Sequence, residues 1–168
     1  MVTTDITGQL AQYMADARYR SLPPEVAQAG KHRILDSLGA IVSGSRLKAG
    51  ELAIRYVRVQ GGVPEASLLA TDVKTSAVNA ALANGMFGHA DETDGFEPVT
   101  KAHPGCPVVP AALAMAEGQG NLGEEVLRAA IADHAGSLQR ADARWVVERV
   151  GGVGDALAAV AQLEADRG

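Results

Sequence analysis

The spacing of apolar and polar positions along the chain predicts a mainly helical protein. Residues 22–44 give the clearest signal: Pro23 and Pro24 suit a first helical turn, and apolar residues then recur every three or four positions (Ile34, Leu35, Leu38, Ile41 and Val42). The same kind of spacing or clear start and stop signals predict further helices over residues 4–19, 48–60, 76–88, 107–118 and 124–132. Residues 65–72 are expected to be extended. The fold class that follows is mainly α, a helical bundle-like domain.

Two of these helices are expected to be buried on all sides. Residues 76–88 are small and apolar almost throughout, and the helix over 107–118 is predicted to hold Pro110 in its first turn and to end at a glycine. In the helix over 22–44, Asp36 lies beside the apolar stripe. A carboxylate near a core needs donors, so we expect Asp36 to accept a hydrogen bond where helices pack.

A stretch rich in ionisable residues joins the two buried helices. It reads "HADETDGFEPVTKAHP", His89 to Pro104, and it combines two histidines, several carboxylates and a lysine. Because apolar helices flank it on both sides, this stretch should place ionisable side chains next to the hydrophobic core. It is therefore the candidate region for acid–base chemistry.

Composition and charge narrow the class of protein. The chain has 168 residues, 47% of them apolar, which is enough for one compact domain with a core. A net charge of −5 argues against nucleic acid as a partner, since carboxylates outnumber lysine and arginine. A single cysteine, Cys106, leaves no internal disulfide. Without a signal-like start or a run of roughly 20 apolar residues, we expect a cytoplasmic protein with no membrane partner.

Four segments resemble the MmgE/PrpD family, which includes 2-methylcitrate dehydratases, cis-aconitate decarboxylase and an iminodisuccinate epimerase. They are "LPPEVAQAGKHRILDSLGAIVSG" (22–44), "PEASLL" (64–69), "NAALANGMFGHADETD" (79–94) and "HPGCPVVPAALAMAE" (103–117). Their order and spacing both fit, so the resemblance is more specific than a single motif.

The resemblance implies a helical first domain, a second lid domain, a homodimer and chemistry without a cofactor or metal on a small carboxylate substrate. That chemistry is dehydration, decarboxylation or epimerisation of a small di- or tricarboxylate such as 2-methylcitrate. Carried over by position, the candidate catalytic residues are Asp91, Glu92, Asp94 and His103, and His89 and Lys101 are candidate substrate-binding residues.

These residue types suit that chemistry. A carbon acid beside a carboxylate needs a positioned base and a nearby cation to stabilise the developing negative charge. Histidine exchanges protons near neutral pH, so His103 suits the role of acid or base. Lys101 would bind a substrate carboxylate as a point charge.

Other interpretations of the same stretch stay open at this stage. The acidic run could be a solvated loop and His103-Pro104 a rigid turn. A metal interpretation uses His89, Asp91, Asp94 and His103, but such loose spacing is common by chance, so no metal is expected. Cys106 is expected to be a small buried apolar residue rather than a nucleophile.

The chain departs from the family pattern in two places. Related runs often place a second acid after Asp94, where this chain has Gly95. After about residue 132 the resemblance fades and no lid domain is legible, so we expect a family-like domain over 1–132 and a divergent helical tail over 133–168, truncated, frame-altered or diverged. Whether the chain is an enzyme is therefore open, and the alternative is a non-catalytic truncated helical module that dimerises.

Overall fold

The computed structural model describes residues 12, 15–16, 19–96, 101–121 and 123–137. The helix predicted over residues 4–19 lies almost wholly outside the described residues, as does the tail from 138 to 168. The described elements are α2 (Pro24–Gly44), α3 (Lys48–Gln60), β1 (Ala66–Ser67), β2 (Lys74–Thr75), α4 (Ala77–Gly88), α5 (Gly105–Gln119) and α6 (Gly123–Ser137). The prediction of a mainly α fold is confirmed. Among the described helices, none combines the length and the apolar character needed to cross a membrane.

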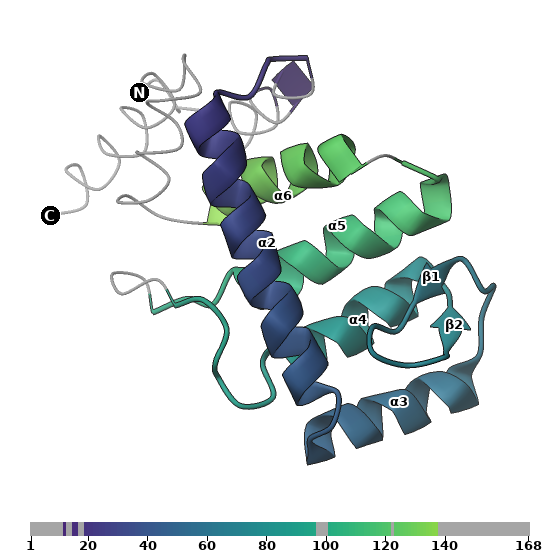
Figure 1. The fold of residues 1–168 in the computed structure, drawn as a ribbon. Helices are drawn as coiled ribbons and strands as arrows, with labels where there is room; N and C mark the ends of the chain where they lie inside the picture. Colours follow the sequence, from purple (N-terminus) through teal and green to yellow (C-terminus); the bar gives the residue numbers. More distant parts are fainter. Residues whose placement is uncertain (1–11, 13–14, 17–18, 97–100, 122, 138–168) are drawn as a thin grey trace, which may run out of the picture.

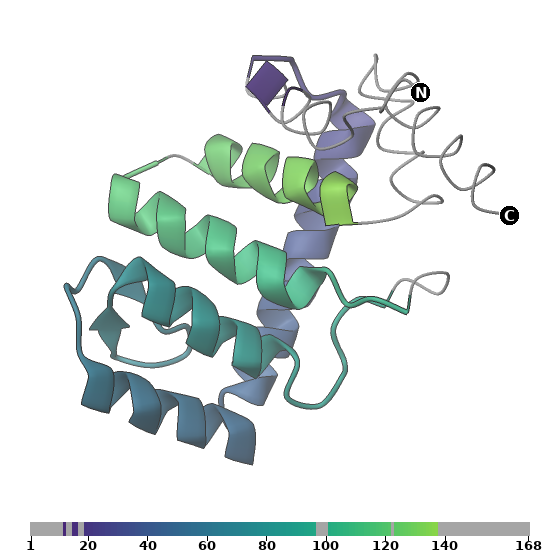
Figure 2. The same cartoon turned by 180° about the vertical axis from the view of Figure 1, so that it is seen from behind.

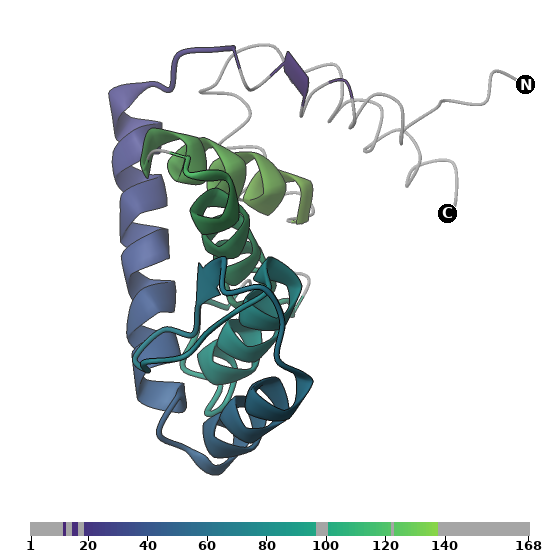
Figure 3. The ribbon, with the colours of Figure 1, turned by 90° about the vertical axis from the view of Figure 1, so that its right-hand side faces the viewer.

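Four helices stack side by side in chain order, and the long helix α2 runs across one face of the stack (Figure 1). Figure 2 shows the stack from behind, with α3, α4, α5 and α6 in front of α2. Helix α4 contacts α5, α2 and α3, and α5 also contacts α6. In the side view of Figure 3, α2 forms one layer, and the stack of α3, α4, α5 and α6 forms the other. Helices α4 and α5 therefore occupy the centre of the stack. The prediction that both are buried on all sides was wrong, because Val78, Leu82 and Met86 of α4 and Met115 of α5 are exposed.

The core lies where α4 meets its neighbours. Phe87, Ile41 and Leu68 are its largest members and are fully buried. Small residues dominate the rest of the cluster: Ala53, Val57, Ala66, Ala80, Ala83 and Ala114. Small side chains let helix axes approach closely, so α4 packs tightly against its neighbours.

The buried face of α2 differs from the predicted one. Leu35 and Val42 belong to the predicted apolar stripe but are 68% and 46% exposed. The face that packs on α4 and α5 keeps Ile41 of the predicted stripe and otherwise carries Ser37, Ala40 and Gly44. Close packing favours these small residues over larger apolar ones. Asp36 is consequently exposed, so the expectation that it points into the helix packing was wrong.

Helix α5 begins earlier than predicted, at Gly105, so Pro110 lies inside the helix and not in its first turn. A proline has no N–H, so the carbonyl of Cys106 receives no helical hydrogen bond from it. Gly85 of α4 passes beside that carbonyl, and a Cβ there would lie 3.1 Å from the oxygen. The early start brings Cys106 into the first turn of α5.

The short hairpin β1–β2 is held to the helices by Asn84. The pair is antiparallel, with Ala66 opposite Thr75. The residues predicted to be extended, 65–72, contribute only the two residues of β1. From buried α4, the Asn84 side chain accepts from the Leu69 N–H (2.9 Å) and donates to the Ser67 carbonyl (2.9 Å). One amide therefore satisfies two backbone groups.

Asn84→Ala should lower the free energy of unfolding by about 2 kcal/mol, because both backbone groups would lose their partner in a partly buried place. Urea denaturation measures the change. Asn121→Ala is the control, since that side chain is exposed and its one hydrogen bond within the described part of the chain is to Gln119, and it should change stability by less than about 0.5 kcal/mol. Equal effects of the two substitutions would contradict this role of Asn84.

Candidate functional site

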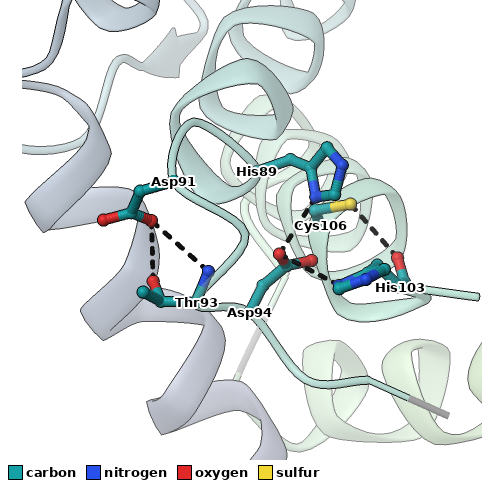
Figure 4. Close-up of polar contacts among 6 residues, drawn as sticks. All are labelled: His89, Asp91, Thr93, Asp94, His103 and Cys106. Atoms are coloured by element: carbon teal, nitrogen blue, oxygen red, sulfur yellow. Dashed lines mark hydrogen bonds and ion pairs between the residues drawn. The ribbon is translucent and has the colours of Figure 1, made fainter. Parts of the chain in front are cut away.

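The candidate site lies between the end of α4 and the start of α5. His89 is the C-cap of α4, and its backbone N–H bonds to the carbonyls of Gly85 and Phe87. His103 and Pro104 immediately precede α5, and Cys106 lies in its first turn. The loop that leaves α4 brings Asp94 between these two helix ends (Figure 4).

A tight turn directs Asp94 inward. Asp91 Oδ1 accepts hydrogen bonds from the Thr93 hydroxyl (2.8 Å) and the Thr93 N–H (3.4 Å). Glu92, between them, has a left-handed backbone with φ of 57°. Figure 4 shows Asp91 and Thr93 on the side of the loop that faces α2, with Asp94 on the other side. Asp91 therefore shapes the turn, and its carboxylate points away from the cluster.

Asp94 is the centre of the cluster. Its side chain is fully buried, and its Oδ1 lies 3.0 Å from His89 Nδ1 in a hydrogen bond. His103 Nδ1 lies 3.2 Å from the same oxygen, within ion-pair distance, but without the geometry of a hydrogen bond. Among the residues that the structure describes, His103 Nδ1 and Asp94 Oδ2 are buried and make no hydrogen bond. One buried carboxylate therefore contacts two imidazoles.

The two histidines stack edge to face and differ in exposure. Their ring centroids are 4.9 Å apart. The His89 side chain is 45% exposed and that of His103 is 20% exposed. Phe96 covers His103 at a ring distance of 5.3 Å. Both imidazoles are therefore partly open to solvent or a ligand, whereas the carboxylate between them is not.

Lys101 and Glu92 lie at the rim. Both are exposed, and Lys101 Nζ lies 5.8 Å from the centre of the Phe96 ring. Lys101 also has a left-handed backbone, with φ of 62°. Of the six sequence-predicted site residues, the structure brings His89, Asp94 and His103 into contact and leaves Asp91, Glu92 and Lys101 outside that contact.

Sequence reasoning missed the part that Cys106 plays. Its Sγ lies 3.1 Å from the His103 carbonyl oxygen, to which the thiol donates. Burial, followed by a hydrogen bond to Asp94 and the negative charge of Asp94, raises the pKa of Cys106 to about 12. Its position in the first turn of a helix, three residues after His103, was the signal that could have placed it here.

Because of this raised pKa, Cys106 should react slowly with iodoacetamide. A pKa of about 12 against an ordinary 9.0 leaves about a thousandfold less thiolate at pH 8. A more basic thiolate is more nucleophilic, which recovers part of the loss, so we expect alkylation to be roughly 10–100-fold slower than in the urea-unfolded chain.

The rate should keep rising with pH above 9, where an ordinary thiol levels off. The chain has one cysteine, so mass spectrometry reports this rate directly. Equal rates in the folded and unfolded chain would contradict the assignment.

Comparison with known proteins agrees with the fold and with the sequence resemblance. The family model of the MmgE/PrpD N-terminal domain matches residues 8–163 of the sequence. The match extends past the boundary predicted at residue 132. That boundary stays a prediction.

The cis-aconitate decarboxylase-like protein oryM of Aspergillus oryzae is 25% identical over 115 residues. The matched part is 68% of this chain but 24% of that relative, so the chain spans about a quarter of the relative's length. A family match over most of the chain and the helical fold lead to one conclusion: the chain belongs to the MmgE/PrpD family.

Proposed function

We propose that the cluster around Asp94 carries out cofactor-independent acid–base chemistry on a small di- or tricarboxylate, such as 2-methylcitrate or cis-aconitate. The observation that carries the proposal is one buried carboxylate in contact with two partly exposed imidazoles. A carboxylate against one ring nitrogen orients the imidazole and stabilises its protonated form. The opposite ring nitrogen is then directed toward the substrate.

In the proposed step, His103 removes a proton from the carbon beside a substrate carboxylate. The C–H electron pair moves toward that carboxylate, and the resulting enolate-like charge needs a cation. The exposed ammonium of Lys101 serves that purpose, and His89 binds the substrate beside it. Glu92, exposed on the loop, is the candidate group for returning a proton or protonating a leaving hydroxyl.

His103→Ala should abolish binding of the dicarboxylate and its turnover, with little loss of stability. The removed ring is partly exposed, so its loss leaves only a small cavity. Calorimetric titration with cis-aconitate and 2-methylcitrate measures binding, and thermal unfolding measures stability. His32→Ala is the matched control, because His32 is exposed on α2 and, within the described residues, its side chain bonds only to Gln28.

Two outcomes would contradict the proposal. One is no binding and no turnover of any such acid by the wild-type chain at high concentration. The other is binding that is the same in wild type and His103→Ala.

A second candidate is a non-catalytic module that assembles with another copy, as a family homodimer would. Exposed apolar residues recur at helical spacing on two neighbouring helices: Leu52, Tyr56 and Val59 on α3, and Val78, Leu82 and Met86 on α4. Such apolar faces are typical of protein interfaces. Light scattering of the purified chain tests this, since Val59→Glu together with Val78→Glu should convert a dimer into a monomer.

A further inference from the structure

Phe96 is a large apolar residue at the edge of a site that is otherwise polar. It is 50% exposed, and its ring centroid lies 5.3 Å from that of His103, the base in the proposed function. Aromatic rings at this separation are in direct contact. A phenyl ring has no acid–base group of its own, so any part that Phe96 plays in the reaction must act through the groups that it touches.

The loop fixes where the Phe96 ring lies. Asp94, two residues earlier, has a fully buried side chain. Gly95 then passes beside α2, where a Cβ on Gly95 would be in ordinary contact with Asp36 Oδ2 (3.5 Å) and Arg33 Nη1 (3.6 Å). The backbone that leads into Phe96 is therefore held on one side by the buried carboxylate and on the other by α2.

The same ring also contacts a cation. Lys101 Nζ lies over the Phe96 ring, 5.8 Å from its centre, which is within the distance at which an ammonium is attracted to a ring face. A carboxylate partner would neutralise the ammonium, whereas a ring attracts it through its quadrupole and leaves its N–H groups available to an anion. The contact therefore suits a lysine that receives a substrate carboxylate.

We propose that Phe96 is a positioning residue: its ring holds the Lys101 ammonium near His103, so that a substrate carboxylate binds the cation while the adjacent C–H faces the base. This role rests on the proposed function, which assigns His103 and Lys101 their parts. A lysine side chain is long and flexible, and a fixed contact removes much of that freedom before the substrate binds. A displacement of about 1 Å in a reacting group can lower the rate by roughly 100-fold.

A purely structural role of Phe96 gives a different expectation. Half of the side chain is already in water, and leucine in its place would keep an apolar contact with the site. A loss of packing would lower stability and activity by the same amounts whether or not residue 101 carries a charge. The dependence of the effect on Lys101 therefore separates positioning from packing.

A double-mutant cycle on the full chain tests the role. Wild type, Phe96→Leu, Lys101→Met and the double variant are compared with whichever of 2-methylcitrate and cis-aconitate the wild type turns over. Phe96→Leu removes the ring face, and we expect it to lower kcat/KM by roughly 10–100-fold. In the Lys101→Met background the same substitution should have an effect of about threefold or less, because the ammonium that the ring positions is already absent.

Two further variants serve as controls. Phe96→Tyr keeps an aromatic ring, so its kcat/KM should stay within about threefold of wild type. Met115 on α5 has the same exposure as Phe96, 51%, and Met115→Leu should leave kcat/KM unchanged. Thermal unfolding of every variant measures stability, which Phe96→Leu should change little.

Three results would overturn this role of Phe96 and leave the proposed function intact. They are an unchanged kcat/KM in Phe96→Leu, additive effects of Phe96→Leu and Lys101→Met, and a loss in Phe96→Tyr as large as that in Phe96→Leu. If the wild-type chain neither binds nor turns over either acid, the proposed function fails, and the role of Phe96 fails with it.

Discussion

Gly44→Ala should lower the free energy of unfolding by about 4 kcal/mol or prevent folding altogether. A Cβ on Gly44 would lie 1.8 Å from the carbonyl oxygen of Phe87 and 2.7 Å from its carbonyl carbon. Overpacking usually costs about 1–3 kcal/mol, but here the obstacle is backbone in the middle of the core and cannot rotate away. The end of α2 or the end of α4 must move.

Gly39→Ala is the matched control on the same helix. A Cβ there meets no atom within 4 Å, so the substitution should stabilise the protein by about 0.5–1 kcal/mol through better helix propensity. Urea denaturation of both variants gives the comparison. Similar stability of the two variants would mean that α2 and α4 do not cross at Gly44 as described.

Asp94→Asn should lower turnover by about 10²–10⁴-fold if the site acts as proposed. The amide keeps the size of the carboxylate but removes the charge that orients and stabilises an imidazolium, and the same change in a serine protease triad has an effect at the upper end of this range. Steady-state kinetics with the acid that the chain turns over measures the loss.

A second measurement separates the role of Asp94 in the site from a role in stability. Asp94 helps to raise the pKa of Cys106, so Asp94→Asn should lower that pKa and speed alkylation of the thiol below pH 9. Asp72→Asn, an exposed carboxylate beside Arg58, should change neither readout. If Asp94 were only structural, activity would fall in proportion to the unfolded fraction and not beyond it.

Most of the helices could be predicted from the sequence because apolar spacing and proline positions are local signals. The buried face of α2 could not, because it depends on how closely α4 approaches. Leu35 is the larger apolar residue, yet Gly44 is the one in the core. Local signals also placed Pro110 in a first turn, whereas packing of Gly105 against Ser37 of α2 accompanies an earlier helix start.

The candidate site was predictable as a stretch of chain but not as a geometry. Histidines at 89 and 103 are far apart in sequence, and only the crossing of α4 and α5 brings both rings to Asp94. The sequence alone did not indicate which of the four neighbouring polar residues in this loop is buried. The turn at Asp91 and Thr93 decides which carboxylate enters the core.

Deuterium exchange tests the central claim, that this cluster removes a proton from a carbon acid, without requiring knowledge of the final product. The chain is incubated in heavy water with 2-methylcitrate or cis-aconitate, and NMR follows deuterium incorporation beside the carboxylates. We expect exchange with wild type and His32→Ala, and exchange at least about 100-fold slower with His103→Ala. Exchange no faster than without protein, or equally fast in His103→Ala, would contradict the account.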